Sequence, residues 1–283
     1  MNNRSIKARA NELIAYCKPQ YIRILFIMAV ISMIPNAFSS TEATALLYVI
    51  ANVLLLPFSH GYVVTSLKIV RNNFNELSDQ DALVGLKRFK ELFFTYFLYG
   101  LLVFVALVVV IVILIVMLGA SLQDLNTLAI VALAGTIITS IVSMLVGLYG
   151  FAFPFLLEKY GYKGMAAIKE SIRFIKGHLF DLFKLELSYL GWTLLVAVVQ
   201  MLLAEVFAFM GTLGSVVAAL IAGAIAIFTY LPQYHVARAI FFEEIAYQRY
   251  GMDTVYTTDE QNEVEEFGFE AYQNEELGDN DVQ

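Results

Sequence analysis

The sequence has 283 residues, of which 59% are hydrophobic and only 15% are charged. Soluble domains carry about a quarter of charged residues, so this composition excludes an ordinary water-soluble domain. The formal net charge of −7 is unevenly distributed, because residues 251–283 hold eleven acidic side chains and no lysine or arginine, whereas residues 1–250 hold 18 basic and 14 acidic ones. We therefore expect a mildly basic membrane body with an acidic tail, and no binding to nucleic acid.

Long apolar stretches with almost no charge recur along the chain, and a stretch of about eighteen residues is long enough to cross ~30 Å of hydrocarbon as a helix. Strand-like alternation is absent over these lengths. The predicted fold class is all-α, a polytopic helical membrane protein with about six transmembrane helices. The spans are expected near residues 21–38, 43–66, 93–119, 127–157, 182–209 and 213–242.

The basic residues predict the orientation of these spans. The expected outer loops, near residues 39–42, 120–126 and 210–212, contain no lysine or arginine. Basic side chains accumulate on the cytoplasmic side of a membrane. We therefore expect an even number of spans, with both termini in the cytoplasm and the protein in the cell membrane.

A charged amphipathic stretch precedes each odd-numbered span, at residues 5–18, 80–92 and 163–180. Such helices lie in the membrane plane and bring basic side chains to an anionic inner leaflet. The predicted organisation is an in-plane helix at 1–20, a six-helix membrane domain at 21–246 with inner loops 67–92 and 158–181, and a disordered acidic tail at 247–283. The expected headgroup contacts are Lys87, Arg88, Lys90, Lys169, Arg173 and Lys176.

Each even-numbered span carries a proline in its inner half, namely Pro57, Pro154 and Pro232. Proline removes a backbone hydrogen bond and kinks a helix, which membrane helices tolerate when neighbours satisfy the freed carbonyl. Together with the in-plane stretches, the prolines suggest three copies of one unit, an in-plane helix followed by a helical hairpin.

The segment AIKESIRFIKGHLFDLFKLELSYLGW at 167–192 resembles the most recognisable stretch of the bacterial integral membrane family known as domain of unknown function 975. The segments RSIKARANEL at 4–13, PFSHGY at 57–62 and ARAIFFEEI at 237–245 are also similar to that family. The resemblance covers most of residues 4–246. It implies a multi-span membrane protein and no known activity, so it supplies no catalytic residues.

Two histidines occupy matching positions, because His60 and His235 each lie three residues after the proline of their span. Such an interfacial pair could bind a metal or sense pH. Two ligands are too few for a metal site, so we expect polar interfacial residues and no cofactor. The single cysteine, Cys17, excludes an internal disulfide, and we expect a small apolar filler there rather than an acylation site.

Three polar residues inside the expected spans could form a path for a solute, namely Asn52, Gln200 and Glu205. Ionisable groups within a span are candidates for function because their burial in hydrocarbon is expensive. Hydrogen bonding between helices, or snorkelling of Glu205 to water, is the alternative. A separate stripe of small residues, Gly214, Ala218, Ala222 and Ala226, predicts close helix packing within one molecule or at a dimer seam.

No pattern in the sequence indicates a nucleophile with a neighbouring base, so we do not expect an enzyme. The favoured interpretation is a membrane scaffold that interacts with lipid or protein partners through its basic in-plane helices and its acidic tail. A small-solute or ion transporter is the alternative. The sequence does not identify a substrate, a partner protein or an oligomeric state.

Overall fold

The structure is a computed structural model that describes residues 2–35, 42–119 and 125–251, and the regular structure in these residues is entirely helical. Its contacts divide the chain into two units, Met1–Phe242 and Glu243–Gln283. The first unit contains the features described below. Most of the predicted acidic tail, from residue 252 onward, lies outside the described residues, as do residues 39–41 of the outer loop predicted at 39–42 and residues 120–124 of the one predicted at 120–126.

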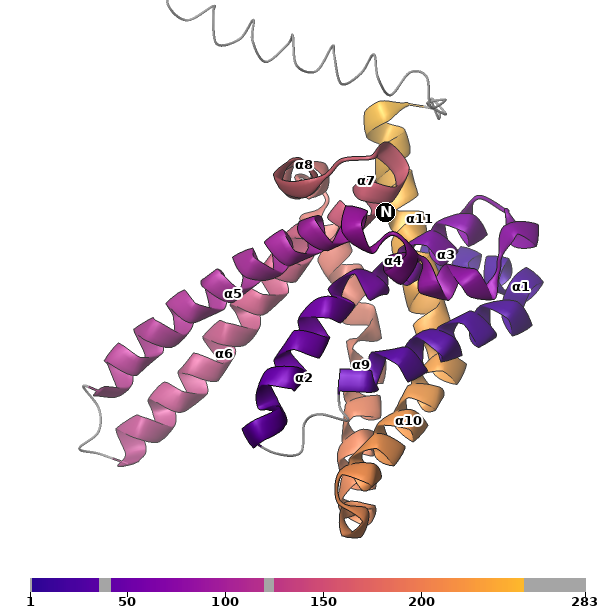
Figure 1. The fold of residues 1–283 in the computed structure, drawn as a ribbon. Coiled ribbons are helices and arrows are strands. Elements are labelled where there is room, and N and C mark those ends of the chain that lie inside the picture. The colour runs from indigo at the N-terminus through magenta and orange to yellow at the C-terminus, as the bar shows by residue number, and fades with distance from the viewer. Residues whose placement is uncertain (1, 36–41, 120–124, 252–283) are drawn as a thin grey trace, which may run out of the picture. The chain divides into compact units, whose positions relative to one another are not determined.

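The helices follow one another in the order expected from the hydropathy pattern (Figure 1). The longer ones are α1 (Asn3–Ser32), α2 (Glu42–Leu55), α3 (His60–Val70), α5 (Phe89–Gly119), α6 (Leu125–Tyr149), α9 (Leu179–Val206), α10 (Thr212–Thr229) and α11 (Leu231–Tyr250). Shorter ones are η2 (Leu56–Ser59), η3 (Phe74–Glu76), η4 (Asp79–Leu83), α4 (Val84–Lys87), α7 (Phe153–Tyr160), α8 (Gly164–Ile175) and η5 (Ala208–Met210).

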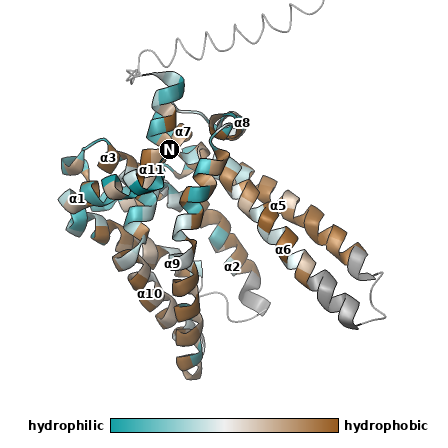
Figure 2. Cartoon of the chain, turned by 180° about the vertical axis from the view of Figure 1, so that it is seen from behind, coloured by the Kyte–Doolittle hydropathy of each residue, from teal (hydrophilic) through white to brown (hydrophobic). Residues whose placement is uncertain are grey.

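Five helical segments are long and apolar enough to cross a membrane, and a sixth span results if α10 and α11, bent by 55° at their junction, are one crossing. This confirms the predicted all-α class with about six spans. Helices α5 and α6 run side by side as a hairpin whose surface is mostly hydrophobic (Figures 1 and 2). Its exposed side chains include Phe104, Val109 and Val116. Such a surface is stable in hydrocarbon, because exposing it to water is unfavourable.

Each of the three prolines lies where an even-numbered span is interrupted. Pro57 lies in η2 between α2 and α3, Pro154 in the first turn of α7, and Pro232 in the first turn of α11. Proline suits a first turn because its missing N–H would have no partner there. At the α6–α7 junction, Ser171 Oγ of α8 donates to the carbonyl of Tyr149 and accepts from the N–H of Ala152. The interruption is therefore satisfied by a buried side chain.

The amino-terminal region is one helix, α1, rather than two separate elements. It runs without interruption from Asn3 to Ser32 and includes Pro19, so no helix end coincides with the expected boundary at residue 20. One face of α1 is buried along its whole length, from Ile6 to Met28. The orientation of its first half in the membrane plane stays a prediction.

The amphipathic stretch at 80–92 is not one helix but is divided among η4, α4 and the start of α5. Ser78 and Asp81 form a reciprocal capping box that begins η4. Gly85 in α4 packs directly on η2, where an added Cβ would lie 2.1 Å from the carbonyl oxygen of Pro57. This close approach explains why the position carries a glycine, and the helical periodicity of the segment did not predict its division.

Candidate functional site

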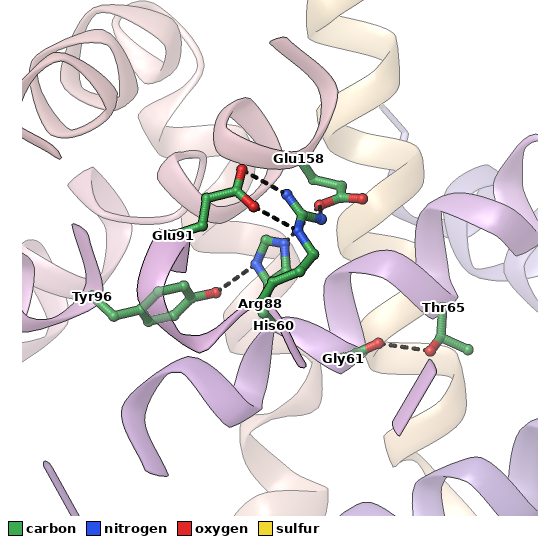
Figure 3. Close-up of polar contacts among 7 residues, drawn as sticks. All are labelled: His60, Gly61, Thr65, Arg88, Glu91, Tyr96 and Glu158. Atoms are coloured by element: carbon green, nitrogen blue, oxygen red, sulfur yellow. Dashed lines mark hydrogen bonds and ion pairs between the residues drawn. The ribbon is translucent and has the colours of Figure 1, made fainter. Parts of the chain in front are cut away.

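A buried polar network surrounds His60, the first residue of α3 (Figure 3). The His60 side chain is completely buried, with Nδ1 2.9 Å from the hydroxyl of Tyr96 on α5. Its Nε2 lies 2.8 Å from Oε2 of Glu158, near the end of α7. Both ring nitrogens are therefore paired, and three helices that are distant in sequence meet at one imidazole.

Arg88 completes this network at its more exposed side. Its Nη1 donates to Oε2 of Glu158 at 2.6 Å, while Nε and Nη2 donate to the two carboxylate oxygens of Glu91 at 2.9 and 3.1 Å. The fork of the guanidinium suits this double role, since it presents several donors in one plane. Hydrogen bonding to Glu91 raises the pKa of the Arg88 guanidinium above its usual value. Arg88 is thus a permanent cation that holds two carboxylates.

The sequence builds this network from the interrupted spans. Pro57 lies in η2, which interrupts the α-helix, and a new α-helix, α3, begins at His60. Gly61, the next residue, has the carbonyl of Asp81 and the side chain of Met28 against its Cα, where a Cβ would lie 2.9 Å from each. The Pro57 interruption and the small residue beside His60 together let α3 pack closely enough to bury the imidazole.

Chemically, the network is a chain of carboxylate, imidazole and phenol. If Nε2–H donates a hydrogen bond to Glu158, then Nδ1 accepts one from the hydroxyl of Tyr96, so the carboxylate and the phenol together select one tautomer. The Glu158 side chain is 22% exposed and Tyr96 is buried. The chain therefore leads from a partly exposed carboxylate to a buried hydroxyl.

Tyr96 also lines a cavity of about 150 Å³. The wall is formed by η2, α3, α5, α7, α11 and the junction of α6 with α7. It consists of Ser59, Tyr62, Val63, Ser66, Tyr96, Phe151, Pro154, Phe155, His235 and Arg238. All three proline-interrupted spans therefore contribute residues to one space.

Arg238 is the cationic residue of this wall. Its Nη1 donates to the hydroxyl of Tyr234 at 3.2 Å, and its Nε lies 3.3 Å from Oε1 of Glu186 on α9. The hydroxyl of Tyr234 in turn donates to Oε2 of Glu186 at 2.9 Å. The guanidinium carbon lies 5.1 Å from the ring centroid of Phe151, within range of a cation–π interaction. Arg238 is therefore held between a carboxylate and two aromatic rings.

The two histidines that share a position after proline have different surroundings. His60 is enclosed by Tyr96 and Glu158, whereas the ring of His235 stacks on Tyr62 with centroids 4.2 Å apart. Both lie next to the cavity, because His235 lines it directly and His60 contacts it through Tyr96. Within the described residues, no group of three or more histidine, cysteine or acidic side chains is arranged to hold a metal ion.

The three residues of the expected polar path lie away from this cavity. The amide of Asn52 donates to the carbonyl of Tyr48 in its own helix at 2.8 Å. Gln200 and Glu205 lie on α9 with exposed side chains. Neither they nor Asn52 belong to the wall of the cavity. The structure thus does not join these three residues, and a path through them stays a prediction.

The expected headgroup contacts divide into two groups. Around the start of α5, Lys87 at the end of α4 donates to Gln80 and Arg88 binds the two carboxylates, while Lys90 in the first turn of α5 is exposed. On α8 and just after it, the side chains of Lys169, Arg173 and Lys176 are exposed. The second group therefore forms the more open basic surface.

The stripe of small residues on α10 lies inside the molecule. Ala218, Ala222 and Ala226 are buried, and α10 packs on α9 and α1. An added Cβ on Gly214 would lie 2.0 Å from the carbonyl oxygen of Phe207. These contacts are packing within one molecule, and a dimer seam on this stripe stays a prediction.

Sequence reasoning missed Glu158, Tyr96 and Arg238. Glu158 falls one residue beyond an expected span and reads as the first charge of a loop, and Tyr96 reads as a generic aromatic residue. Arg238 lies inside the last expected span, at 213–242, which should have marked it as a candidate, because a cation within a span needs a partner.

One comparison with known proteins identifies a family for this chain. The family model described as "Protein of unknown function (DUF975)" matches residues 1–249. No curated protein and no solved structure matches the chain. The matched segment contains the His60 network, the cavity and α8, and the chain therefore belongs to the DUF975 family of proteins of unknown function.

Proposed function

We propose that this protein is a non-enzymatic integral membrane protein that binds anionic lipid headgroups through the exposed face of α8. In this proposal the protein resides in the cell membrane with both termini and α8 on the cytoplasmic side. The observation that carries the proposal is the composition of that face, which combines basic and apolar side chains on one short helix.

One side of α8 packs on the protein. Ala167, Ile168, Ser171 and Phe174 are buried, and the α8 backbone is anchored where the N–H of Gly164 donates to Oγ1 of Thr95 at 2.8 Å. The helix is therefore fixed to α5 and to the α6–α7 junction, and its other side has a defined direction.

The outward side of α8 carries Lys169 and Arg173, and Lys176 follows at its end. The apolar side chains among them are also exposed, with Ile172 at 46% and Met165 at 41%. Phe180, at the start of α9, is 66% exposed. Apolar side chains next to basic ones suit the boundary between acyl chains and headgroups, where each type meets its preferred surroundings.

The expected strength of this interaction is substantial. A lysine or arginine close to an anionic leaflet contributes about 1 kcal/mol, roughly fivefold in binding, at physiological ionic strength. Three such residues on one short segment therefore suffice to enrich anionic lipid around it. The acidic tail would be repelled by the same leaflet, which leaves it available to a cytoplasmic or membrane protein partner.

The proposal assigns no catalysis to the His60 network. The hydroxyl beside the imidazole is the phenol of Tyr96, buried and held at 2.9 Å, so the network does not form the serine–histidine or cysteine–histidine pair of nucleophilic catalysis.

A local fluorescence reporter tests the proposal. The chain contains one tryptophan, Trp192, so the double variant W192F/I172W carries a single tryptophan on the exposed side of α8. The variant is reconstituted into mixtures of phosphatidylglycerol and phosphatidylcholine in which only one of the two lipids is brominated, so the reporter is quenched by the brominated lipid next to it. We expect stronger quenching when phosphatidylglycerol is the brominated lipid than when phosphatidylcholine is.

The additional change K169Q/R173Q/K176Q should abolish this preference for phosphatidylglycerol. The matched control R4Q/R9Q removes two exposed basic residues from α1 and should leave quenching at position 172 unchanged. Equal quenching by both lipids before the α8 charges are removed, or an undiminished preference afterwards, would refute the proposal.

A second candidate function is supported by the cavity. A cavity that is lined by all three interrupted spans and includes some polar side chains is the kind of feature that a small-solute or ion transporter needs. Transport would require this space to open alternately to the two sides of the membrane. Flux of candidate solutes or protons into proteoliposomes, compared between the wild type and Y96F, tests this alternative.

A further inference from the structure

We propose that the cavity beside Arg238 is a binding site for a phosphate group. The proposal goes beyond the lipid surface of α8, because Arg238 lies on α11 and takes no part in that surface. It rests on the donors of Arg238, on its present counter-ion, and on the size and wall of the cavity.

The guanidinium of Arg238 has unused capacity to donate. Of its five N–H donors, the described residues accept one, where Nη1 donates to Tyr234. Nε is buried and makes no hydrogen bond with any described residue. Unsatisfied buried donors are unfavourable, and those of a charged group most of all. A bound oxyanion would satisfy them.

The resident counter-ion of Arg238 is poorly placed to fill that role. Glu186 Oε1 lies 3.3 Å from Nε without a hydrogen bond, and its other oxygen accepts from Tyr234. The Glu186 carboxylate neutralises the charge of Arg238 but accepts no hydrogen bond from its Nε. A phosphate, by contrast, can accept two parallel N–H bonds from a guanidinium. Glu186 thus keeps the empty site neutral and competes with the ligand.

The cavity has the room for such a group. A volume of about 150 Å³ exceeds the ~30 Å³ that one water occupies in the liquid several-fold. The side chains of Ser59, Tyr62 and Tyr96 belong to its wall, and those of Phe151 and Phe155 form another part of it. The hydroxyl of Tyr96 is held by His60, whereas the hydroxyl of Ser59 donates to the carbonyl of Leu56 in its own turn and can rotate towards a ligand instead. The aromatic walls weaken the screening of the charge pair.

A tetrahedral phosphate fits this arrangement better than a planar carboxylate, because its oxygens face several directions at once. The same chemistry comes from two sources, the headgroup of a phospholipid and free inorganic phosphate. Both are anions that the Arg238 fork would bind, and the experiment below separates them.

The test uses the purified, delipidated full chain in an uncharged detergent and measures binding by calorimetry. The probes are inorganic phosphate, a short-chain phosphatidic acid, a short-chain diacylglycerol without phosphate, and acetate at equal ionic strength. The variant that removes the fork is R238Q/E186Q, which deletes both charges of the pair and so leaves neither one buried alone. E186Q alone removes the competing carboxylate.

We expect saturable one-to-one binding of phosphatidic acid, of inorganic phosphate, or of both, and none of diacylglycerol or acetate. The double variant should bind about tenfold more weakly or worse, equivalent to the loss of one charge-assisted hydrogen bond. E186Q should bind more tightly than the wild type, an effect that a purely structural Arg238 would not produce. Binding of phosphatidic acid alone assigns the site to lipid headgroups, and binding of inorganic phosphate assigns it to the free ion.

Undiminished binding by an R238Q/E186Q variant with wild-type thermal stability would overturn the proposal, as would equal binding of acetate or binding of neither phosphate probe. The α8 variant K169Q/R173Q/K176Q should bind these probes one-to-one as the wild type does. Its loss of phosphatidylglycerol preference at position 172 is measured separately, so failure of the α8 proposal and failure of the cavity proposal are distinguishable.

Discussion

His60 on α3 and Glu158 on α7 are joined by a 2.8 Å hydrogen bond although they are 98 positions apart in the chain. The same imidazole holds the hydroxyl of Tyr96 on α5 through its other nitrogen. Three of the helices that surround the cavity are therefore connected through one buried side chain. The consequences of this arrangement can be measured.

Replacing His60 with alanine should destabilise the protein. The change leaves the buried hydroxyl of Tyr96 without its partner, at a cost of about 1–3 kcal/mol, whereas Glu158 keeps its hydrogen bond from Arg88. The expected result is a lower midpoint of thermal unfolding in detergent. His178, which makes no side-chain capping bond at the start of α9, provides the control, since H178A should change stability by less than ~0.5 kcal/mol. Equal effects of the two changes would show that the network contributes nothing to stability.

The contact between Gly85 and Pro57 predicts a second large effect. In G85A the new Cβ would lie 2.1 Å from the Pro57 carbonyl oxygen and 2.6 Å from Cα of Phe58, so backbone must move. Overpacking of this kind costs about 1–3 kcal/mol or more. Gly191 in α9 has no atom within 4 Å of an added Cβ, so G191A should leave stability unchanged or raise it by up to ~1 kcal/mol. The ranking is measured by thermal unfolding, and a stable G85A would contradict the packing of η2 on α4.

Cys17 should react slowly with a maleimide in the folded protein. Its side chain is 4% exposed and its thiol points to the carbonyl of Leu13. The neighbouring Tyr16 is 69% exposed, so the variant Y16C/C17S supplies a matched accessible thiol. The measurement is the rate of labelling in detergent before and after denaturation. Fast labelling of native Cys17, or an acyl chain on it detected by mass spectrometry, would contradict its role as a buried filler.

The sequence predicted those parts of the structure that follow from local pattern. Hydropathy indicated about six spans, proline positions indicated where α2, α6 and α10 give way to α3, α7 and α11, and periodicity indicated the amphipathic α8. Each of these depends on residues within a few turns of one another.

The candidate site could not be predicted in the same way, because its pairings are tertiary. His60 was identified through its offset from Pro57, but nothing local distinguishes it from His235, which stacks on Tyr62 instead of bonding to a carboxylate. Glu158 follows an expected span and resembles any charge at the start of a loop. His60 and Glu158 come together only because α3 packs on α7 in the folded protein.

The membrane topology is the basis of the whole account, and cysteine accessibility in intact cells measures it most directly. In a C17S background, one cysteine is placed in the expected outer loop by S121C and another at the exposed second residue of α5 by K90C. A membrane-impermeant maleimide should label the first in intact cells and the second only after permeabilisation. Labelling of K90C from outside, or of S121C only after permeabilisation, would contradict an even number of crossings with the basic loops in the cytoplasm.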